Sequence, residues 1–180
     1  MRKYSKAVIG VPPRFRGVTL ETFDWKENAG VLSAVERFER RELQLLGLYG
    51  RPGVGKTHIA ISLYRESIYG AISNALFLEV SELFNMVKSG YGENRNVLEE
   101  LRVYPLLIID DLMSGNCSAT DMEIIAEIIK ERYISKKQLL VTTNLLPNEL
   151  ERALGYHELS RLFGMGSWVE VKGEDRRMDV

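Results

Sequence analysis

Short apolar runs alternate with amphipathic segments along most of this chain. Most residues of these runs are apolar, as expected for strands that are buried on both faces of a sheet. The runs cover residues 43–49, 75–80, 106–109, 138–143 and 167–171. Between them, apolar residues recur at the helical period, for example within residues 56–69. Strands that alternate with helices imply right-handed crossovers, so we expect an α/β fold in which helices flank a five-stranded, mainly parallel sheet.

The helix before the fourth run has the clearest predicted start. Thr120 followed by Glu123 fits a capping box, and an apolar stripe of isoleucines comes next. We expect this helix to continue to about Ser135. Weaker helical patterns predict a helix over residues 28–42 and one or two short helices within residues 148–163.

The chain divides into a basic arm and a core. Within residues 1–27, basic residues precede the first acidic residue, Glu21; they are Arg2, Lys3, Lys6, Arg14 and Arg16. Pro12 and Pro13 disfavour regular structure there, so we expect an extended arm. Residues 28–180 carry the alternating pattern and form the predicted core domain. At this length we expect no helical lid after the last strand and no docking domain before the core.

The composition is that of an ordinary globular protein, with 180 residues of which 45% are hydrophobic and 27% charged. Lys and Arg number 24 against 25 Asp and Glu, so nucleic acid binding would need a local basic patch or an assembly. The single cysteine, Cys117, excludes intramolecular disulfides and zinc sites built from several thiolates. No apolar stretch approaches the ~18 residues of a membrane span. We therefore expect a cytoplasmic protein.

A glycine-rich loop lies between the first apolar run and the helix that follows it. Residues 50–57 satisfy the pattern G-x-x-x-x-G-K-[ST], whose backbone N–H groups can surround phosphate oxygens at a helix N-terminus. We expect Lys56 to contact the β- and γ-phosphates of ATP and the Thr57 hydroxyl to bind Mg²⁺. The predicted nucleotide contacts are Gly50, Arg51, Pro52, Gly53, Val54, Gly55, Lys56, Thr57 and His58. For His58 we expect a packing role rather than chemistry. The alternative for the loop is a strand-to-helix turn that binds nothing.

The third and fourth apolar runs end in polar residues, at the sheet edge where parallel α/β folds bind ligands. Side chains of neighbouring strand residues alternate between faces, so Asp110 and Asp111 should have different roles. We expect Asp110 to hold Mg²⁺ and Asp111 to orient or deprotonate the attacking water. Asn144, after the fourth run, is expected to position that water without adding charge. The alternatives are that Asp111 caps the next loop and that Asn144 forms a turn.

Three motifs occur in a characteristic order: Gly-x-x-Gly-x-Gly-Lys-Thr-His, Leu-Ile-Ile-Asp-Asp-Leu and Thr-Thr-Asn-Leu. In this respect the chain resembles the DnaC/DnaI helicase loaders and the related IstB-like transposition ATPases of the AAA+ class. The resemblance extends over roughly residues 10–177. It includes the arm at 11–23, Glu-Arg-Tyr at 131–133, Leu-Ser-Arg-Leu at 159–162 and the basic ending at 169–177.

The resemblance implies a Mg²⁺-dependent ATPase with an AAA+ P-loop core that works as a homo-oligomer. Arg161 would act as an arginine finger, reaching the γ-phosphate held by a neighbouring subunit. Arg177 would sense nucleotide within its own subunit. The alternative for Arg161 is an ordinary surface arginine on a helix.

The resemblance also implies a role in DNA replication, in which the protein loads or remodels a replicative helicase on single-stranded DNA. An ATPase helper of a transposase is the alternative. Candidate DNA contacts are Lys88, Tyr91 and Arg95, because basic groups with interleaved aromatics can neutralise phosphates and stack bases; a solvated surface is the competing interpretation. A small-molecule P-loop kinase fits less well, since no Arg-rich lid is visible. A non-hydrolysing scaffold stays open because Asp111 occupies a position where Glu is commoner.

Overall fold

The structure is a computed structural model that describes residues 13–15, 17–69, 74–92, 96–113, 115 and 117–176. Within these residues, five strands form one sheet, and every neighbouring pair is parallel. The strands are β1 Leu45–Tyr49, β2 Ala75–Glu79, β3 Leu106–Leu112, β4 Gln138–Thr143 and β5 Gly166–Glu170. Their order across the sheet is β2-β3-β4-β1-β5. The predicted α/β fold with a five-stranded parallel sheet is therefore confirmed.

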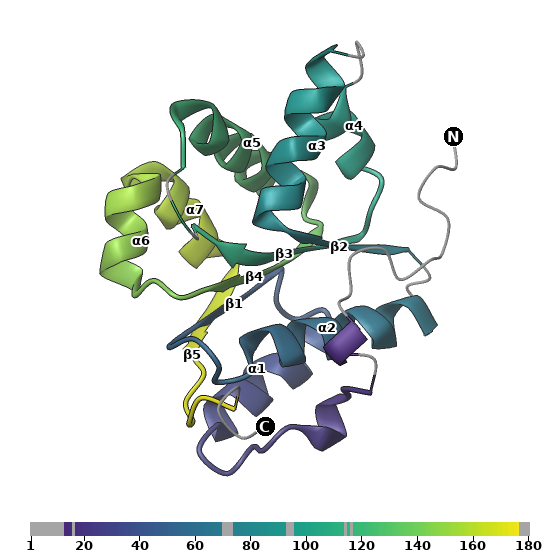
Figure 1. The fold of residues 1–180 in the computed structure, drawn as a ribbon, viewed down its shortest axis with the longest axis vertical. Helices are drawn as coiled ribbons and strands as arrows, with labels where there is room; N and C mark the ends of the chain where they lie inside the picture. Colours follow the sequence, from purple (N-terminus) through teal and green to yellow (C-terminus); the bar gives the residue numbers. More distant parts are fainter. Residues whose placement is uncertain are drawn as a thin grey trace.

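Helices cover both faces of the sheet (Figure 1). Two lie on one face, α1 Ala29–Glu39 and α2 Lys56–Tyr69. Five lie on the other, α3 Val80–Gly92, α4 Val97–Leu101, α5 Ala119–Ser135, α6 Pro147–Leu154 and α7 Tyr156–Met165. Among the residues described, no helix is both long enough and apolar enough to cross a membrane.

Successive strand residues pack into two separate apolar clusters, which explains why the strands are apolar throughout. Leu45 and Leu107 face the cluster formed with α3, α5, α6 and α7. Leu46 and Ile108 face the cluster formed with α1 and α2. Burying one such side chain stabilises the fold by about 1.5–3 kcal/mol. The sheet is thus a rigid central layer whose carboxyl edge can hold polar side chains in place.

The N-cap of helix α5 is Ser118, two residues before the predicted N-cap, Thr120. The hydroxyl of Ser118 accepts a hydrogen bond from the backbone N–H of Asp121, while the Asp121 carboxylate accepts from the N–H of Ser118. The prediction of a box made by Thr120 and Glu123 was wrong. Both pairs have the required spacing, but the pair of Ser118 and Asp121 caps the N-terminus of the helix.

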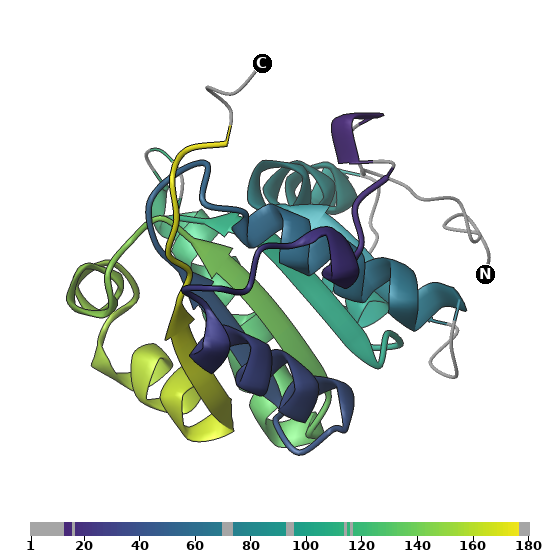
Figure 2. The ribbon, with the colours of Figure 1, turned by 90° about the horizontal axis from the view of Figure 1, so that it is seen from below.

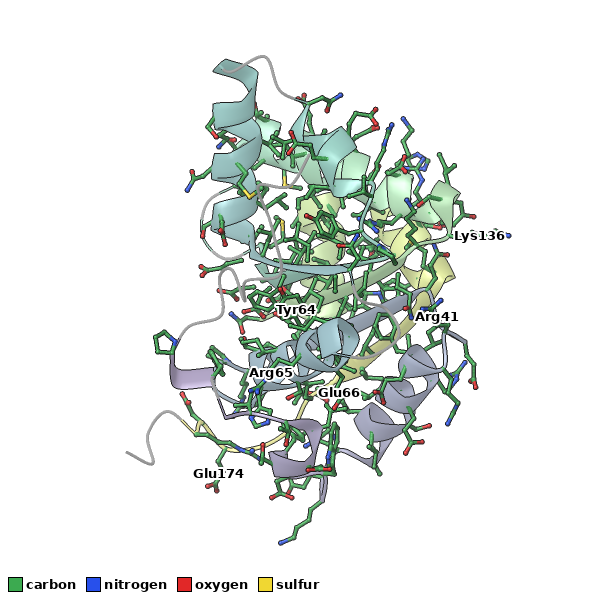
Figure 3. The ribbon with its side chains drawn as sticks, turned by 90° about the vertical axis from the view of Figure 1, so that its right-hand side faces the viewer. Arg41, Tyr64, Arg65, Glu66, Lys136 and Glu174 are labelled. Atoms are coloured by element: carbon green, nitrogen blue, oxygen red, sulfur yellow. The ribbon has the colours of Figure 1, made fainter. Side chains whose placement is uncertain are left out.

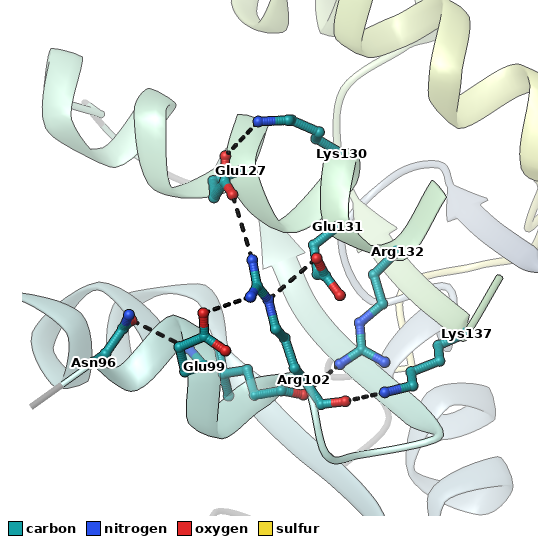
Figure 4. A network of polar contacts seen from close by, with 9 residues as sticks. Asn96, Glu99, Arg102, Glu127, Lys130, Glu131, Arg132 and Lys137 are labelled. Atoms are coloured by element: carbon teal, nitrogen blue, oxygen red, sulfur yellow. Dashed lines mark hydrogen bonds and ion pairs between the residues drawn. The ribbon is translucent and has the colours of Figure 1, made fainter. Parts of the chain in front are cut away.

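A fully buried arginine ties α5 to the connection that precedes β3. Arg132 is 1% exposed and donates hydrogen bonds to the carbonyl oxygens of Tyr104, at 2.5 Å, and Leu101, at 2.6 Å. Burial lowers the pKa of Arg132 to about 10, so the guanidinium stays charged at neutral pH. Nearby, Arg102 forms ion pairs with Glu99 and with glutamates of α5 (Figure 4). These contacts attach α5 to the chain just before β3.

The described part of the N-terminal arm packs along α2 (Figure 2). The guanidinium of Arg65, on α2 (Figure 3), donates to the carbonyl oxygen of Val18 at 3.2 Å. Trp25 donates from its indole nitrogen to the carbonyl oxygen of Leu20 at 2.9 Å. Residues 1–12 and 16 of the predicted basic arm lie outside the described residues. The contacts place the rest of the arm beside the helix that begins with the glycine-rich loop.

Candidate nucleotide site

The glycine-rich loop joins β1 to α2 in a conformation that requires its glycines. Gly50, Gly53 and Gly55 have φ angles of 140°, 81° and 103°, a region that side chains other than glycine rarely adopt. The loop is also closely packed from outside. A Cβ on Gly53 would lie 1.7 Å from a carboxylate oxygen of Asp175, and one on Gly55 would lie 2.6 Å from the ring of Phe23. The N-terminal arm and the C-terminal tail therefore hold the loop between them.

Lys56 begins α2 and is buried inside this loop, with 6% of its surface exposed. Its ammonium donates hydrogen bonds at 2.8 Å to the carbonyl oxygens of Gly50 and Arg51 and to Oδ1 of Asn144. A buried ammonium needs such partners, because an isolated charge is costly away from water. The lysine thus links the loop to the end of β4, as expected of a group that faces the phosphates.

Thr57 and Asp110 lie face to face across the gap between α2 and β3. The Thr57 hydroxyl is 3.1 and 3.0 Å from the two carboxylate oxygens of Asp110. Burial raises the pKa of Asp110, while hydrogen bonds from Thr142 and Thr57 oppose the shift. A hydroxyl beside a carboxylate is the hard oxygen donor set that Mg²⁺ prefers. The residues present therefore fit the predicted metal ion.

Asp111 is connected to the glycine-rich loop through the side-chain amide of Asn144. Asn144 donates from Nδ2 to Oδ1 of Asp111 at 2.9 Å, while its own Oδ1 accepts from Lys56. Asp111 is only partly buried and Asn144 is exposed, so this side of the site is open to water. The structure brings Lys56, Asp111 and Asn144 together, as the motif order predicts.

A β-bulge alters the expected arrangement of the two aspartates. Ile109 pairs with Val141, but the next pair is Leu112 with Thr143, so two residues of β3 oppose one of β4. Strict alternation therefore fails, and Asp110 and Asp111 both connect to the loop-to-helix junction at residues 56–57. The two carboxylates have different partners, Thr57 and Thr142 for Asp110 and Asn144 for Asp111, and their different roles stay a prediction.

His58 connects α2 to the N-terminal arm. Its Nε2 lies 2.9 Å from the carbonyl oxygen of Thr19 and 3.2 Å from the hydroxyl of Thr22. Burial lowers the pKa of His58, and its ring meets the ring of Phe23 edge-on at 5.6 Å. These contacts agree with a packing role; a direct contact between His58 and nucleotide stays a prediction.

The remaining predicted site residues lie away from this cluster or outside the described residues. Within the described part, the polar partner of Arg161 is Glu158 of the same helix, at 3.2 Å, rather than any group of residues 50–57. Lys88, on α3, pairs with the buried Asp121 at 2.8 Å. The other three candidates, or their side chains, fall outside the described residues: Tyr91, Arg95 and Arg177. Their roles stay predictions.

One buried residue of the site was not predicted. Thr142, which is 1% exposed, donates from its hydroxyl to Oδ1 of Asp110 at 2.6 Å and accepts from the backbone N–H of Asp111 at 2.9 Å. The sequence carries a signal for it, namely a hydroxyl within an otherwise apolar strand. The hydroxyl alone does not indicate which residues it binds, because its hydrogen-bond partners depend on the bulge in β3.

Comparison with known proteins adds a family to this geometry. The family model of the IstB-like ATP binding protein matches residues 21–179. The ATP-binding protein of insertion sequence IS21 from Pseudomonas aeruginosa is 28% identical over 174 residues, which cover 89% of this chain and 64% of that protein. The replicative helicase loader DnaC of Escherichia coli K12 is 29% identical over 137 residues, covering 73% of this chain and 55% of DnaC.

A solved structure is similar over most of the fold. The crystal structure of the DnaC helicase loader has a TM-score of 0.78 and 26% identity to this chain, and the match covers 89% of this chain and 100% of that one. Against the two curated relatives, by contrast, the chain spans 64% and 55% of their length. The similarity therefore covers only part of each of these two proteins.

Proposed function

Because the chain belongs to the family of IstB-like ATP-binding proteins, we propose that it is an AAA+ protein that hydrolyses ATP with Mg²⁺. The observation that carries this proposal is the continuous hydrogen-bonded path from Lys56 through Asn144 to Asp111, and from Thr57 to Asp110. The path collects a cation, an amide, two carboxylates and a hydroxyl at one edge of the sheet. These are the groups that phosphoryl transfer to water requires.

In this proposal the glycine-rich loop holds the triphosphate. The loop presents backbone N–H groups and the N-terminus of α2, and the ammonium of Lys56 neutralises phosphate charge. Thr57 and Asp110 would hold Mg²⁺, which supplies positive charge that polarises the β- and γ-phosphates. At present the Lys56 ammonium donates to loop carbonyls and to Asn144, so nucleotide binding would replace some of these partners with phosphate oxygens.

Hydrolysis then depends on Asp111 and Asn144. In the proposal, Asp111 accepts a hydrogen bond, and later the proton, from the water that attacks the γ-phosphorus. Asn144 orients this water with an uncharged group and holds the carboxylate of Asp111 at 2.9 Å. Both side chains face solvent, so water has access. We assign to Arg161 of a neighbouring copy the role of a second cation opposite Lys56, since within the described residues its polar partner is Glu158 of its own helix.

We place the ATPase in DNA replication, as a loader or remodeller of a replicative helicase on single-stranded DNA. The named relative DnaC is a helicase loader. The alternative, an ATPase helper of a transposase, is favoured by the longer match to the insertion-sequence protein, 174 residues against 137. Lys88 is paired with Asp121, so affinity for DNA should come mainly from an assembly of several copies.

Phosphate release from ATP tests the proposal. We expect release by the parent chain in Mg²⁺, and a loss of at least about 100-fold in Lys56→Ala, because the buried ammonium is removed from the phosphates. Lys26→Ala, which changes an exposed lysine of the arm, is the matched control and should leave the rate unchanged. Absence of release by the parent, alone and with single-stranded DNA, would contradict the ATPase proposal.

The same assay separates the two biological roles when a purified partner is added. Stimulation by a replicative helicase with single-stranded DNA, and not by a transposase, is the result expected for a loader. The reverse pattern would assign the chain to transposition instead.

A further inference from the structure

The bulge in β3 sets the position of both aspartates, and one side chain of β4 holds it. Between the pairs Ile109 with Val141 and Leu112 with Thr143, the residues Asp110 and Asp111 share a single opposite position. In a regular ladder the backbone N–H of each residue would find a carbonyl acceptor on the neighbouring strand. Here the N–H of Asp111 is bound instead by the side-chain oxygen of Thr142, at 2.9 Å.

We propose that Thr142 is a positioning residue for ATP hydrolysis, whose one hydroxyl holds both the carboxylate of Asp110 and the backbone of Asp111. This inference rests on the proposed function. A hydroxyl has one donor hydrogen and two acceptor lone pairs. The hydroxyl of Thr142 donates its hydrogen to Oδ1 of Asp110, at 2.6 Å, and accepts a hydrogen bond from the backbone N–H of Asp111. The same oxygen atom therefore sets the distance between the metal-binding and the water-binding residue.

The second bond also supports an unusual backbone. Asp111 has φ of 60°, in the left-handed region that costs roughly 1 kcal/mol or more for a residue with a side chain. Met113, two residues farther along, is also left-handed, at 65°. Thr142 is 1% exposed, so water cannot easily replace its hydroxyl. Loss of the hydroxyl would leave the N–H of Asp111 without this acceptor and Asp110 without its shortest hydrogen bond.

The neighbouring Thr143 gives a matched control. It is 0% exposed, donates to the carbonyl oxygen of Leu112 at 2.8 Å and accepts from the N–H of Leu145 at 3.1 Å. Its hydroxyl thus has the same number of partners in the same strand, but these bonds involve neither carboxylate. If buried threonine hydroxyls had only a structural role, replacing Thr142 or Thr143 by valine should have the same effect on ATP hydrolysis.

The experiment compares Thr142→Val, Thr142→Ser and Thr143→Val in the full chain. Two quantities are measured: kcat and KM for ATP, and the affinity for a non-hydrolysable ATP analogue with Mg²⁺ and with EDTA. For Thr142→Val we expect kcat to fall about 10- to 100-fold. Most of the Mg²⁺-dependent gain in analogue affinity should also be lost, while the affinity in EDTA is unchanged. Thr142→Ser should restore both quantities, and Thr143→Val should resemble the parent.

Two results would overturn the inference: equal behaviour of Thr142→Val and Thr143→Val, or an unchanged Mg²⁺-dependent gain in Thr142→Val. Should either valine variant not fold, Thr142→Ala and Thr143→Ala replace the pair, with the same expectations. A parent chain that binds the analogue but releases no phosphate would contradict the proposed function. In that case the Mg²⁺-dependent gain in affinity for the analogue, compared between the parent and Thr142→Val, would still test whether Thr142 positions Asp110.

Discussion

At the residue scale, the structure shows how far single side chains depend on their partners. Asp121 caps α5 and also pairs with Lys88 of α3 at 2.8 Å. The hydrogen bond from Lys88, followed by that from Ser118, lowers the pKa of Asp121 from 3.8 to about 2. A carboxylate with a lowered pKa stabilises the folded state above its unfolded pKa, and the contribution is lost as the pH falls through the folded value.

We therefore expect acid to destabilise the parent more than an Asp121→Asn variant. Between about pH 4 and pH 2 the free energy of unfolding of the parent should fall by about 1 kcal/mol more than that of the variant, a value reduced because Lys88 is half exposed. Denaturant unfolding at several pH values measures this difference. Glu123→Gln, on the exposed side of the same helix, is the control and should follow the parent. Parallel curves for the parent and Asp121→Asn would refute the assignment.

Most site residues could be predicted because they belong to short motifs with a fixed local geometry. A glycine-rich loop before a helix indicates where Lys56 and Thr57 lie, and polar residues at strand ends indicate Asp110 and Asn144. Thr142 could not be assigned in this way. Its partners are 31 and 32 positions away in sequence, and they meet its hydroxyl only because β3 contains an extra residue.

At the element scale, strands were easier to predict than the ends and irregularities of elements. A buried parallel strand is mostly apolar on both faces, so each of the five runs overlaps a strand. The helix α4 was not predicted, because its five residues, Val97–Leu101, are too few to show a helical period. The bulge has no periodic signal at all. An aspartate with positive φ is visible only once the pairing of β3 with β4 is known.

The tail that follows β5 is an element whose contribution can be measured. Asn28, which is 3% exposed, donates to the carbonyl oxygen of Lys172 at 3.0 Å and accepts from its N–H at 2.9 Å. Farther along, the N–H of Arg176 donates to the carbonyl oxygen of Gly53 at 3.3 Å. The bonds of Asn28 join residues 144 positions apart, and the bond of Arg176 attaches the tail to the glycine-rich loop.

We expect Asn28→Ala to lower the free energy of unfolding by about 1–3 kcal/mol, since the two hydrogen bonds to the backbone of Lys172 are lost. Asn85→Ala, at an exposed position of α3, is the matched control and should change it by less than about 0.5 kcal/mol. Chemical denaturation of both variants gives the comparison. Equal stability of the two variants would show that the tail does not contribute through Asn28.

At the scale of the whole molecule, the site is built on one edge of the sheet and is open on one side. Lys56 starts α2 on one face, whereas Arg161 belongs to α7 on the other face (Figure 1). The side chain of Arg161 is 38% exposed, and its guanidinium contacts Glu158 of its own helix. An exposed arginine on the opposite layer is available to a neighbouring copy. The near-zero net charge also gives no long-range repulsion between copies.

The central claim, an ATPase completed by a neighbouring copy, is tested most directly by mixing two inactive variants. Arg161→Ala removes the proposed finger, and Asp111→Asn removes the carboxylate proposed to activate water. If the finger acts between copies, the site of an Arg161→Ala copy keeps its Asp111 and can receive an intact Arg161 from a neighbouring Asp111→Asn copy. Phosphate release should then be recovered on mixing to a substantial fraction of the parent rate, while each variant alone stays inactive. Mixtures that release no more phosphate than the separate variants would contradict the account.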